Sequence, residues 1–174
     1  ENPWHGRPPP LDYLDDARNL TRAHKLALHL DGARVFNAAV RQQVEVSSIT
    51  SRFDSVSACL SKGLGAPVGS VLCGSRIFID SARRWRKVLG GGWRQAGVLA
   101  AAGLYVLEHH IERLAMDHHH AALLAESLAE IEELSVDNLP DRTNMVWVEA
   151  PQWSLADLAP SLRKEGVLIS MDDY

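Results

Sequence analysis

The stretch that decides the fold is Ser-Val-Ser-Ala-Cys-Leu-Ser-Lys-Gly-Leu-Gly-Ala-Pro-Val-Gly-Ser, residues 55–70. A short apolar run precedes Lys62, glycines follow it, and a second apolar run begins at Val68, which predicts strand, turn and strand. Lys62 has few carboxylate side chains near it in this stretch. A low-dielectric setting would lower the pKa of its amine and make it a candidate nucleophile for imine chemistry. The alternative is a surface lysine in a hairpin loop, so other residues must decide between the two.

Composition indicates a globular protein with a sizeable core, since the 174 residues are 46% hydrophobic and 23% charged. With a net charge of −4, the chain as a whole is not attracted electrostatically to nucleic acid or to an anionic membrane surface. No apolar run approaches the roughly 20 residues that span a bilayer, and no signal-peptide pattern is seen, so we expect a soluble protein without a membrane partner.

The two cysteines, Cys59 and Cys73, both lie in apolar runs, where reduced thiols behave as small hydrophobes. This usage favours a reducing compartment, so we expect a cytoplasmic protein, with a mitochondrial location left open. The sequence starts at Glu1 rather than Met, and an apolar run stands just before its last residues. We therefore expect a piece of a longer chain.

Hydrophobic periodicity predicts an alternation of helices and strands along most of the chain. Expected helices cover residues 11–24, 35–42, 76–89, 95–110, 111–133 and 155–165, and that over 95–110 is apolar almost all round and so expected to be buried. On the helix over 76–89, an apolar face is available for burial. Expected strands cover residues 26–30, 53–60, 68–73, 143–149 and 167–170. This order indicates an α/β or α+β protein with a largely parallel first sheet.

Asp31 directly follows the first expected strand, and Lys62 follows the second with one residue, Ser61, between them. In a parallel pair both would emerge at the carboxyl edge of the sheet, where ligands of open α/β sheets bind. A lysine that holds an aldehyde and a carboxylate that keeps a ring nitrogen protonated suit pyridoxal phosphate. Arg34 could then reach the ring oxygen or a substrate carboxylate. The alternatives are a helix cap for Asp31 and a plain ion pair between Asp31 and Arg34.

Basic residues gather between Arg76 and Arg94, where six of them face one acid, Asp80. Glycines precede Arg94 at an expected helix start, and such termini, together with arginines, hold phosphate well. A nucleic-acid patch is the competing interpretation, but few aromatic residues accompany the basic ones and the rest of the chain is acidic, so we expect no nucleic-acid partner. A solvated helix face is the alternative for Arg83 and Arg84.

The histidines at 109–110 and 118–120 invite a metal hypothesis. Adjacent histidines on a helix point in different directions, and neither a His pair at i and i+4 nor a cysteine cluster supports zinc. We expect these histidines at the surface and no metal site. The glycine-rich stretch lacks Gly-Lys-Ser/Thr, so it is not a nucleotide P-loop.

Together these segments resemble the low-specificity L-threonine aldolases over essentially the whole chain. The motifs that carry the resemblance are His29-Leu30-Asp31-Gly32-Ala33-Arg34 with Phe36-Asn37-Ala38, residues 59–70, Arg84-Trp85-Arg86-Lys87, residues 90–97, Thr143-Asn144-Met145-Val146 and residues 166–170. The resemblance implies a fold-type-I pyridoxal phosphate enzyme that splits L-threonine and L-allo-threonine into glycine and acetaldehyde. It also implies the C-terminal part of the cofactor-binding large domain over residues 1–110 and an incomplete small α+β domain over 111–174.

By the same resemblance, Lys62 is the Schiff-base lysine, Asp31 pairs with the pyridinium nitrogen, and Arg34 contacts the cofactor or the substrate carboxylate. Lys87 and Arg94 match basic residues used at the active site of an adjacent subunit, with Arg94 near the phosphate. A homo-oligomer follows, at least a dimer and commonly a tetramer. We keep two alternatives: a non-catalytic remnant or association module of the same fold, and a related lyase acting on another β-hydroxy or β-substituted amino acid.

The chain departs from the family pattern in three places. The family's Glu-Asn-Thr-His segment reads Glu1-Asn2-Pro3-Trp4 here, so that Trp4 takes the place of the active-site histidine and His5 is displaced by one. The family's N-terminal half, with its phosphate-cradling loop and ring-stacking histidine, is absent from the sequence. The carboxylate-binding arginine near the family's C-terminus would lie beyond Tyr174.

Overall fold

The computed structural model describes residues 6–137 and 140–169. Its central element is a three-stranded sheet in the order β1 (His29–Gly32), β2 (Ser55–Cys59) and β3 (Ser70–Gly74). β1 and β2 run parallel with Asp31 opposite Ser57, and β2 and β3 run antiparallel. The strand, turn and strand predicted around Lys62 are therefore confirmed. The strands are antiparallel because the connection over residues 60–69 is too short for a parallel crossover.

The first strand lies further along the chain than its hydrophobic run predicts. β1 begins at His29 and includes Asp31, whereas the expected strand covered residues 26–30. Leu26 is exposed, and its amide donates to the Thr21 carbonyl at 2.9 Å, which keeps this residue in the connection after the first helix. Asp31 consequently lies inside the strand and near its carboxyl end.

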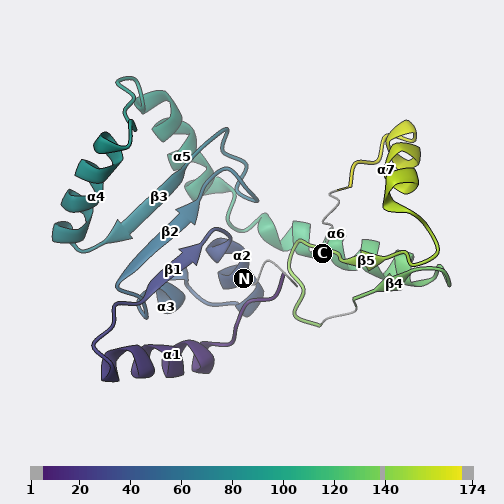
Figure 1. Cartoon of the computed structure of the whole chain (residues 1–174), viewed down its shortest axis with the longest axis horizontal. Coiled ribbons are helices and arrows are strands. Elements are labelled where there is room, and N and C mark those ends of the chain that lie inside the picture. The colour runs from purple at the N-terminus through teal and green to yellow at the C-terminus, as the bar shows by residue number, and fades with distance from the viewer. Residues whose placement is uncertain (1–5, 138–139, 170–174) are drawn as a thin grey trace.

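Three helices pack around a core beside the sheet: α1 (Leu11–Ala23), α2 (Val35–Gln42) and α3 (Val46–Thr50) (Figure 1). α2 has the predicted bounds, whereas the short α3 was not predicted. In the strands, alternate residues face opposite sides, and Ala58 faces this core. The buried residues of the core are Leu14, Val35, Ala38, Ala39, Ile49 and Ala58.

The helices α4 (Arg76–Val88) and α5 (Gly97–His109) have the predicted type but not the predicted burial. α4 begins cleanly, since Ser75 Oγ accepts from the Phe78 amide, yet it buries none of its residues, and Ile77 is 85% exposed. α5 buries only Gly103 and Val106. Apart from the residues around Val106, most apolar side chains of the two helices are not covered by any other described segment of the chain.

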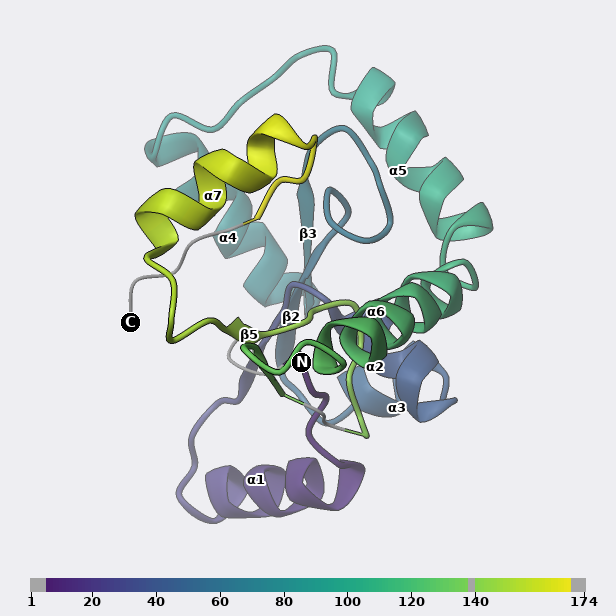
Figure 2. The ribbon, with the colours of Figure 1, turned by 90° about the vertical axis from the view of Figure 1, so that its right-hand side faces the viewer.

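The last part of the chain extends away from the sheet along α6 (Leu114–Ala129), which packs against α2 and β4 (Figures 1 and 2). A two-residue antiparallel ladder follows, formed by β4 (Ser135–Val136) and β5 (Val148–Glu149), and then α7 (Leu155–Lys164). The strand expected over 143–149 is thus confined to its last two residues. Residues 167–169 are not a strand, and Ser170 lies outside the described residues.

Within residues 6–137 and 140–169, no helix combines the length and the apolar character that a bilayer crossing requires.

Candidate functional site

Asp31 lies at the carboxyl end of β1, with its carboxylate free to face a ligand. It is exposed, and its Oδ1 accepts a hydrogen bond from the Ala33 amide at 3.2 Å. This contact supports the turn into α2 but does not cap the helix, because the residue in the N-cap position is Arg34. The alternative of a cap on a helix starting near Ala33 is therefore wrong, because no side chain among the described residues caps α2.

Lys62 stands on the hairpin loop just past β2, the strand parallel to β1. The loop folds back on itself, since the Gly65 amide donates to the Lys62 carbonyl at 2.8 Å and the Ala66 amide donates to the Leu60 carbonyl at 2.9 Å. The parallel pairing of β1 with β2 brings Asp31 and the lysine loop to the same edge of the sheet, as predicted. In this chain Lys62 is exposed, so the expected low-dielectric setting is not formed by the described residues.

Glycines let the backbone approach closely around both residues. A Cβ at Gly32 would lie 2.8 Å from the Ser57 carbonyl oxygen of the neighbouring strand. A Cβ at Gly63, next to the lysine, would lie 2.8 Å from Leu114 Cδ2 and 3.2 Å from Asn37 Oδ1. The lysine loop is therefore seated directly on α2 and the start of α6.

Arg34 lies between Asp31 and α2 and is half-buried. No ion pair between Arg34 and Asp31 occurs in the described part of the chain. The alternative that these two residues form a plain ion pair is therefore wrong. Its Nε is buried and has no hydrogen-bond partner among the described residues. A buried N–H without an acceptor costs about 1–3 kcal/mol, so an anionic or carbonyl ligand oxygen would be stabilising here.

A buried polar network lies beneath the lysine loop, and sequence reasoning missed it. Asn37 Nδ2 lies 3.2 Å from His118 Nε2 and 3.3 Å from Asn144 Oδ1, and Thr143 Oγ1 donates to the Gly6 carbonyl at 2.6 Å. The network joins α2, α6 and the segments around residues 6 and 143. It thereby fixes the floor on which Gly63 rests.

His118 was expected at the surface, but it is 7% exposed, so this prediction is wrong. Burial lowers the pKa of His118 below its usual range, Arg41 lowers it further, and Asp117 opposes both. The amide of Asn37 donates to Nε2 only when this nitrogen carries no proton, which also favours the neutral ring. Helical spacing could have revealed the burial, because His118 follows Leu114 by four residues and precedes Ala121 by three.

Lys87 and Arg94 do not join Asp31 and Lys62 in this structure. Both are exposed, Lys87 near the end of α4 and Arg94 in the turn before α5. No hydrogen bond or ion pair links either of them to Asp31 or Lys62 within the described residues. Among those residues, too, no cluster of three or more His, Cys, Asp or Glu side chains could hold a metal ion.

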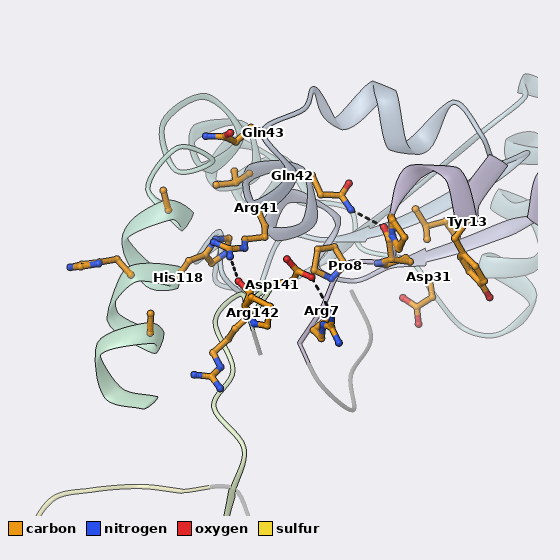
Figure 3. A pocket seen from close by; sticks show the side chains of 18 of the residues that line it. Arg7, Pro8, Tyr13, Asp31, Arg41, Gln42, Gln43, His118, Asp141 and Arg142 are labelled. Atoms are coloured by element: carbon orange, nitrogen blue, oxygen red, sulfur yellow. Dashed lines mark hydrogen bonds and ion pairs between the residues drawn. The ribbon is translucent and has the colours of Figure 1, made fainter. Parts of the chain in front are cut away.

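A groove of about 1490 Å³ lies between α1, β1, α2 and α6, with Asp31 toward one end and His118 toward the other (Figure 3). Two of its arginines are engaged by the protein itself, since Arg7 pairs with Asp141 at 3.1 Å and Arg41 donates to the Pro140 carbonyl. The third, Arg142, has a buried Nη2 with no hydrogen-bond partner among the described residues. Lys62 does not line this groove. The groove shares Asp31 with the candidate site and His118 with the polar network beneath the lysine loop.

Comparison with known proteins places these features in context. The model of the family described as "Beta-eliminating lyase" matches residues 1–151. A low-specificity L-threonine aldolase of Escherichia coli K12 is 46% identical over 170 residues, which are 98% of this chain and 50% of that protein. An Arabidopsis thaliana protein named probable low-specificity L-threonine aldolase 2 is 48% identical over 167 residues, 94% of this chain and 47% of that one.

A solved structure agrees with the fold. The crystal structure from Exiguobacterium sp. 255-15 of a protein provisionally named an aromatic amino acid β-eliminating lyase/threonine aldolase superposes with a TM-score of 0.82 at 26% identity. The match covers 92% of this chain and 45% of that one. The chain thus spans about half the length of the proteins that it matches.

Proposed function

This chain belongs to the β-eliminating lyase family, and on that premise we propose that it is part of an enzyme that cleaves L-threonine and L-allo-threonine to glycine and acetaldehyde. The observation that carries the proposal is the position of Lys62 and Asp31 at one edge of a parallel strand pair. The identity of 46% to a protein named low-specificity L-threonine aldolase supports the substrate class. A proteolytic, nucleotide or metal-dependent role has no comparable support.

The residues at this edge fit pyridoxal 5'-phosphate, the cofactor of this enzyme family. Asp31 offers an exposed carboxylate, Lys62 an exposed primary amine, and Arg34 a buried Nε with no partner among the described residues. These are the groups required by a ligand with a basic ring nitrogen, an aldehyde and anionic oxygens. Glycines at 32 and 63 bring the backbone close enough that a side chain at either position would disturb this arrangement.

Each residue has a separate task in the proposed reaction. The amine of Lys62 would hold the cofactor at its aldehyde carbon. The carboxylate of Asp31 accepts a hydrogen bond from the ring nitrogen and so retains the proton there. The guanidinium of Arg34 orients the cofactor or the substrate carboxylate by charge-assisted hydrogen bonds. When bound, the cofactor accepts the electron pair released as the Cα–Cβ bond breaks.

The β-hydroxyl proton must also leave the substrate during cleavage. The family's histidine position is Trp4 in this chain, next to His5, and both lie outside the described residues. We therefore assign no proton acceptor to the described part of the chain.

We further propose that the enzyme works as a homo-oligomer, a dimer or tetramer, in which Lys87 and Arg94 serve a neighbouring subunit's site. Both residues are exposed, and α4, which carries Lys87, also exposes Ile77 and Trp85. An uncovered face that combines apolar and basic groups suits an interface. We assign residues 1–110 to the large cofactor-binding domain and 111–174 to the small domain. Because both cysteines are free thiols, we place the enzyme in a reducing compartment, the cytosol, with a mitochondrial location left open.

The test is acetaldehyde release from L-allo-threonine, measured for the 174-residue chain and for a chain extended to the length of its relatives. We expect release by the extended chain, and its loss by at least three orders of magnitude in Lys62→Ala, because covalent attachment then fails. Lys164→Ala, which alters an exposed lysine on α7, is the matched control and should retain activity. No release by the extended wild-type chain would favour the non-catalytic association module instead.

A further inference from the structure

The loop that carries Lys62 is anchored by its neighbour Leu64. Leu64 is 3% exposed and packs with Leu60, Ala66, Val106 and Leu114, so the loop points one side chain into the core while Lys62 faces outward. The backbone hydrogen bonds of the loop include the one from the Gly65 amide to the Lys62 carbonyl, but within the described residues none of them uses the amide or the carbonyl of Leu64. The orientation of the lysine therefore also depends on what holds the Leu64 backbone.

A histidine from the end of α5 holds that backbone. His110 Nδ1 lies 2.6 Å from the Leu64 carbonyl oxygen, a contact between residues 46 positions apart in sequence. Because a carbonyl can only accept, Nδ1 carries the proton and donates. The ring is itself restrained by Tyr105, which meets it edge-on at 5.5 Å between centroids, and the His110 amide bonds the Val106 carbonyl at 2.9 Å.

We propose that His110 is a positioning residue for Lys62, an inference that rests on the proposed role of Lys62 as the cofactor-binding lysine. Its hydrogen bond ties the lysine loop to α5, while Leu114 and Asn37 support the same loop beneath Gly63. Loss of the donor leaves the Leu64 carbonyl without its partner and releases the loop to sample other conformations. The amine of Lys62 then spends less time in the orientation that attaches an aldehyde.

The experiment compares variants that keep or remove the donor at Nδ1. His110→Asn places an amide N–H near the Nδ1 position, whereas His110→Leu has no donor and His110→Gln carries its donor too far out. His109→Leu is the matched control, since His109 is exposed and bonds no loop atom. Each protein is incubated with a series of pyridoxal phosphate concentrations and reduced with borohydride. The measurement is the concentration at which the label on Lys62, and separately on Lys164, reaches half of its maximum.

We expect half-saturation at Lys62 to require about tenfold more pyridoxal phosphate in His110→Leu and His110→Gln, and near-wild-type levels in His110→Asn and His109→Leu. Labelling at Lys164 should be unchanged in all four. Wild-type affinity at Lys62 in both His110→Leu and His110→Gln would overturn the proposal. Equal losses in His110→Asn would do the same, because a merely structural role does not depend on restoring the donor.

A measurement without cofactor separates this inference from the proposed function. Amide hydrogen exchange over residues 62–66 should be about tenfold faster in His110→Gln than in wild type and His110→Asn. If Lys62 in wild type takes no label, the cofactor proposal fails, yet the exchange rates still decide whether His110 holds the loop. Unchanged exchange in His110→Gln would show that it does not.

Discussion

Leu114 offers the sharpest test of how the lysine loop is supported. Its side chain is fully buried, it packs with Leu60, Leu64 and Val106, and its Cδ2 lies 2.8 Å from where a Cβ on Gly63 would stand. Leu114→Ala removes the side chain that packs between α6 and the loop. Transfer of a buried leucine contributes about 2 kcal/mol, and the residual cavity adds about 1 kcal/mol because a turn can partly collapse onto it.

We therefore expect Leu114→Ala to lower the free energy of unfolding by about 3 kcal/mol, measured by urea denaturation followed by circular dichroism. The matched control is Leu124→Ala on the same helix, where the leucine is 52% exposed and the change should stay within about 0.5 kcal/mol. If the two substitutions cost the same, Leu114 does not form the support described for the loop, and the argument that packing seats Lys62 loses its basis.

Two further substitutions test the floor and the edge of the site. His118 has a lowered pKa in the folded state, so the unfolded chain binds a proton first as pH falls, and stability should decline from just above pH 6.5 downward. His118→Gln should flatten this decline in urea titrations at several pH values, whereas the exposed His119→Gln should leave it as in wild type. Gly32→Ala would place a Cβ 2.8 Å from the Ser57 carbonyl and should cost about 2 kcal/mol or more. Gly97→Ala, which meets open space, should be neutral or slightly stabilising by thermal denaturation, and equal effects at both glycines would contradict the close strand approach.

The elements that carry Asp31, Arg34 and Lys62 could be predicted from short stretches of sequence. The bounds of α2 follow from its apolar spacing, and the glycines after Lys62 predicted the hairpin between β2 and β3. The parallel pairing that brings Asp31 and Lys62 to one edge could be inferred because a helix intervenes between the two strands. The roles of these residues toward a cofactor stay predictions.

Contacts between distant segments could not be predicted in the same way. Apolar periodicity shows which face of α4 and α5 can be buried, but not which segment covers it, and in this chain Ile77 and Val98 remain exposed. Helical spacing indicates that His118 can be buried, but not that its partner is Asn37 on α2, and the hydrogen bond of His110 joins residues 46 positions apart. Such contacts arise only when the fold has formed.

The most direct test of the central claim is the site at which pyridoxal phosphate attaches. The chain has four lysines, Lys25, Lys62, Lys87 and Lys164, so borohydride reduction followed by peptide mapping compares them within one sample. At limiting pyridoxal phosphate and with circular dichroism confirming a folded protein, we expect the label to accumulate on Lys62 before the other three. Preferential label on any other lysine, with Lys62 unmodified, would contradict the assignment of this loop as the cofactor-binding site.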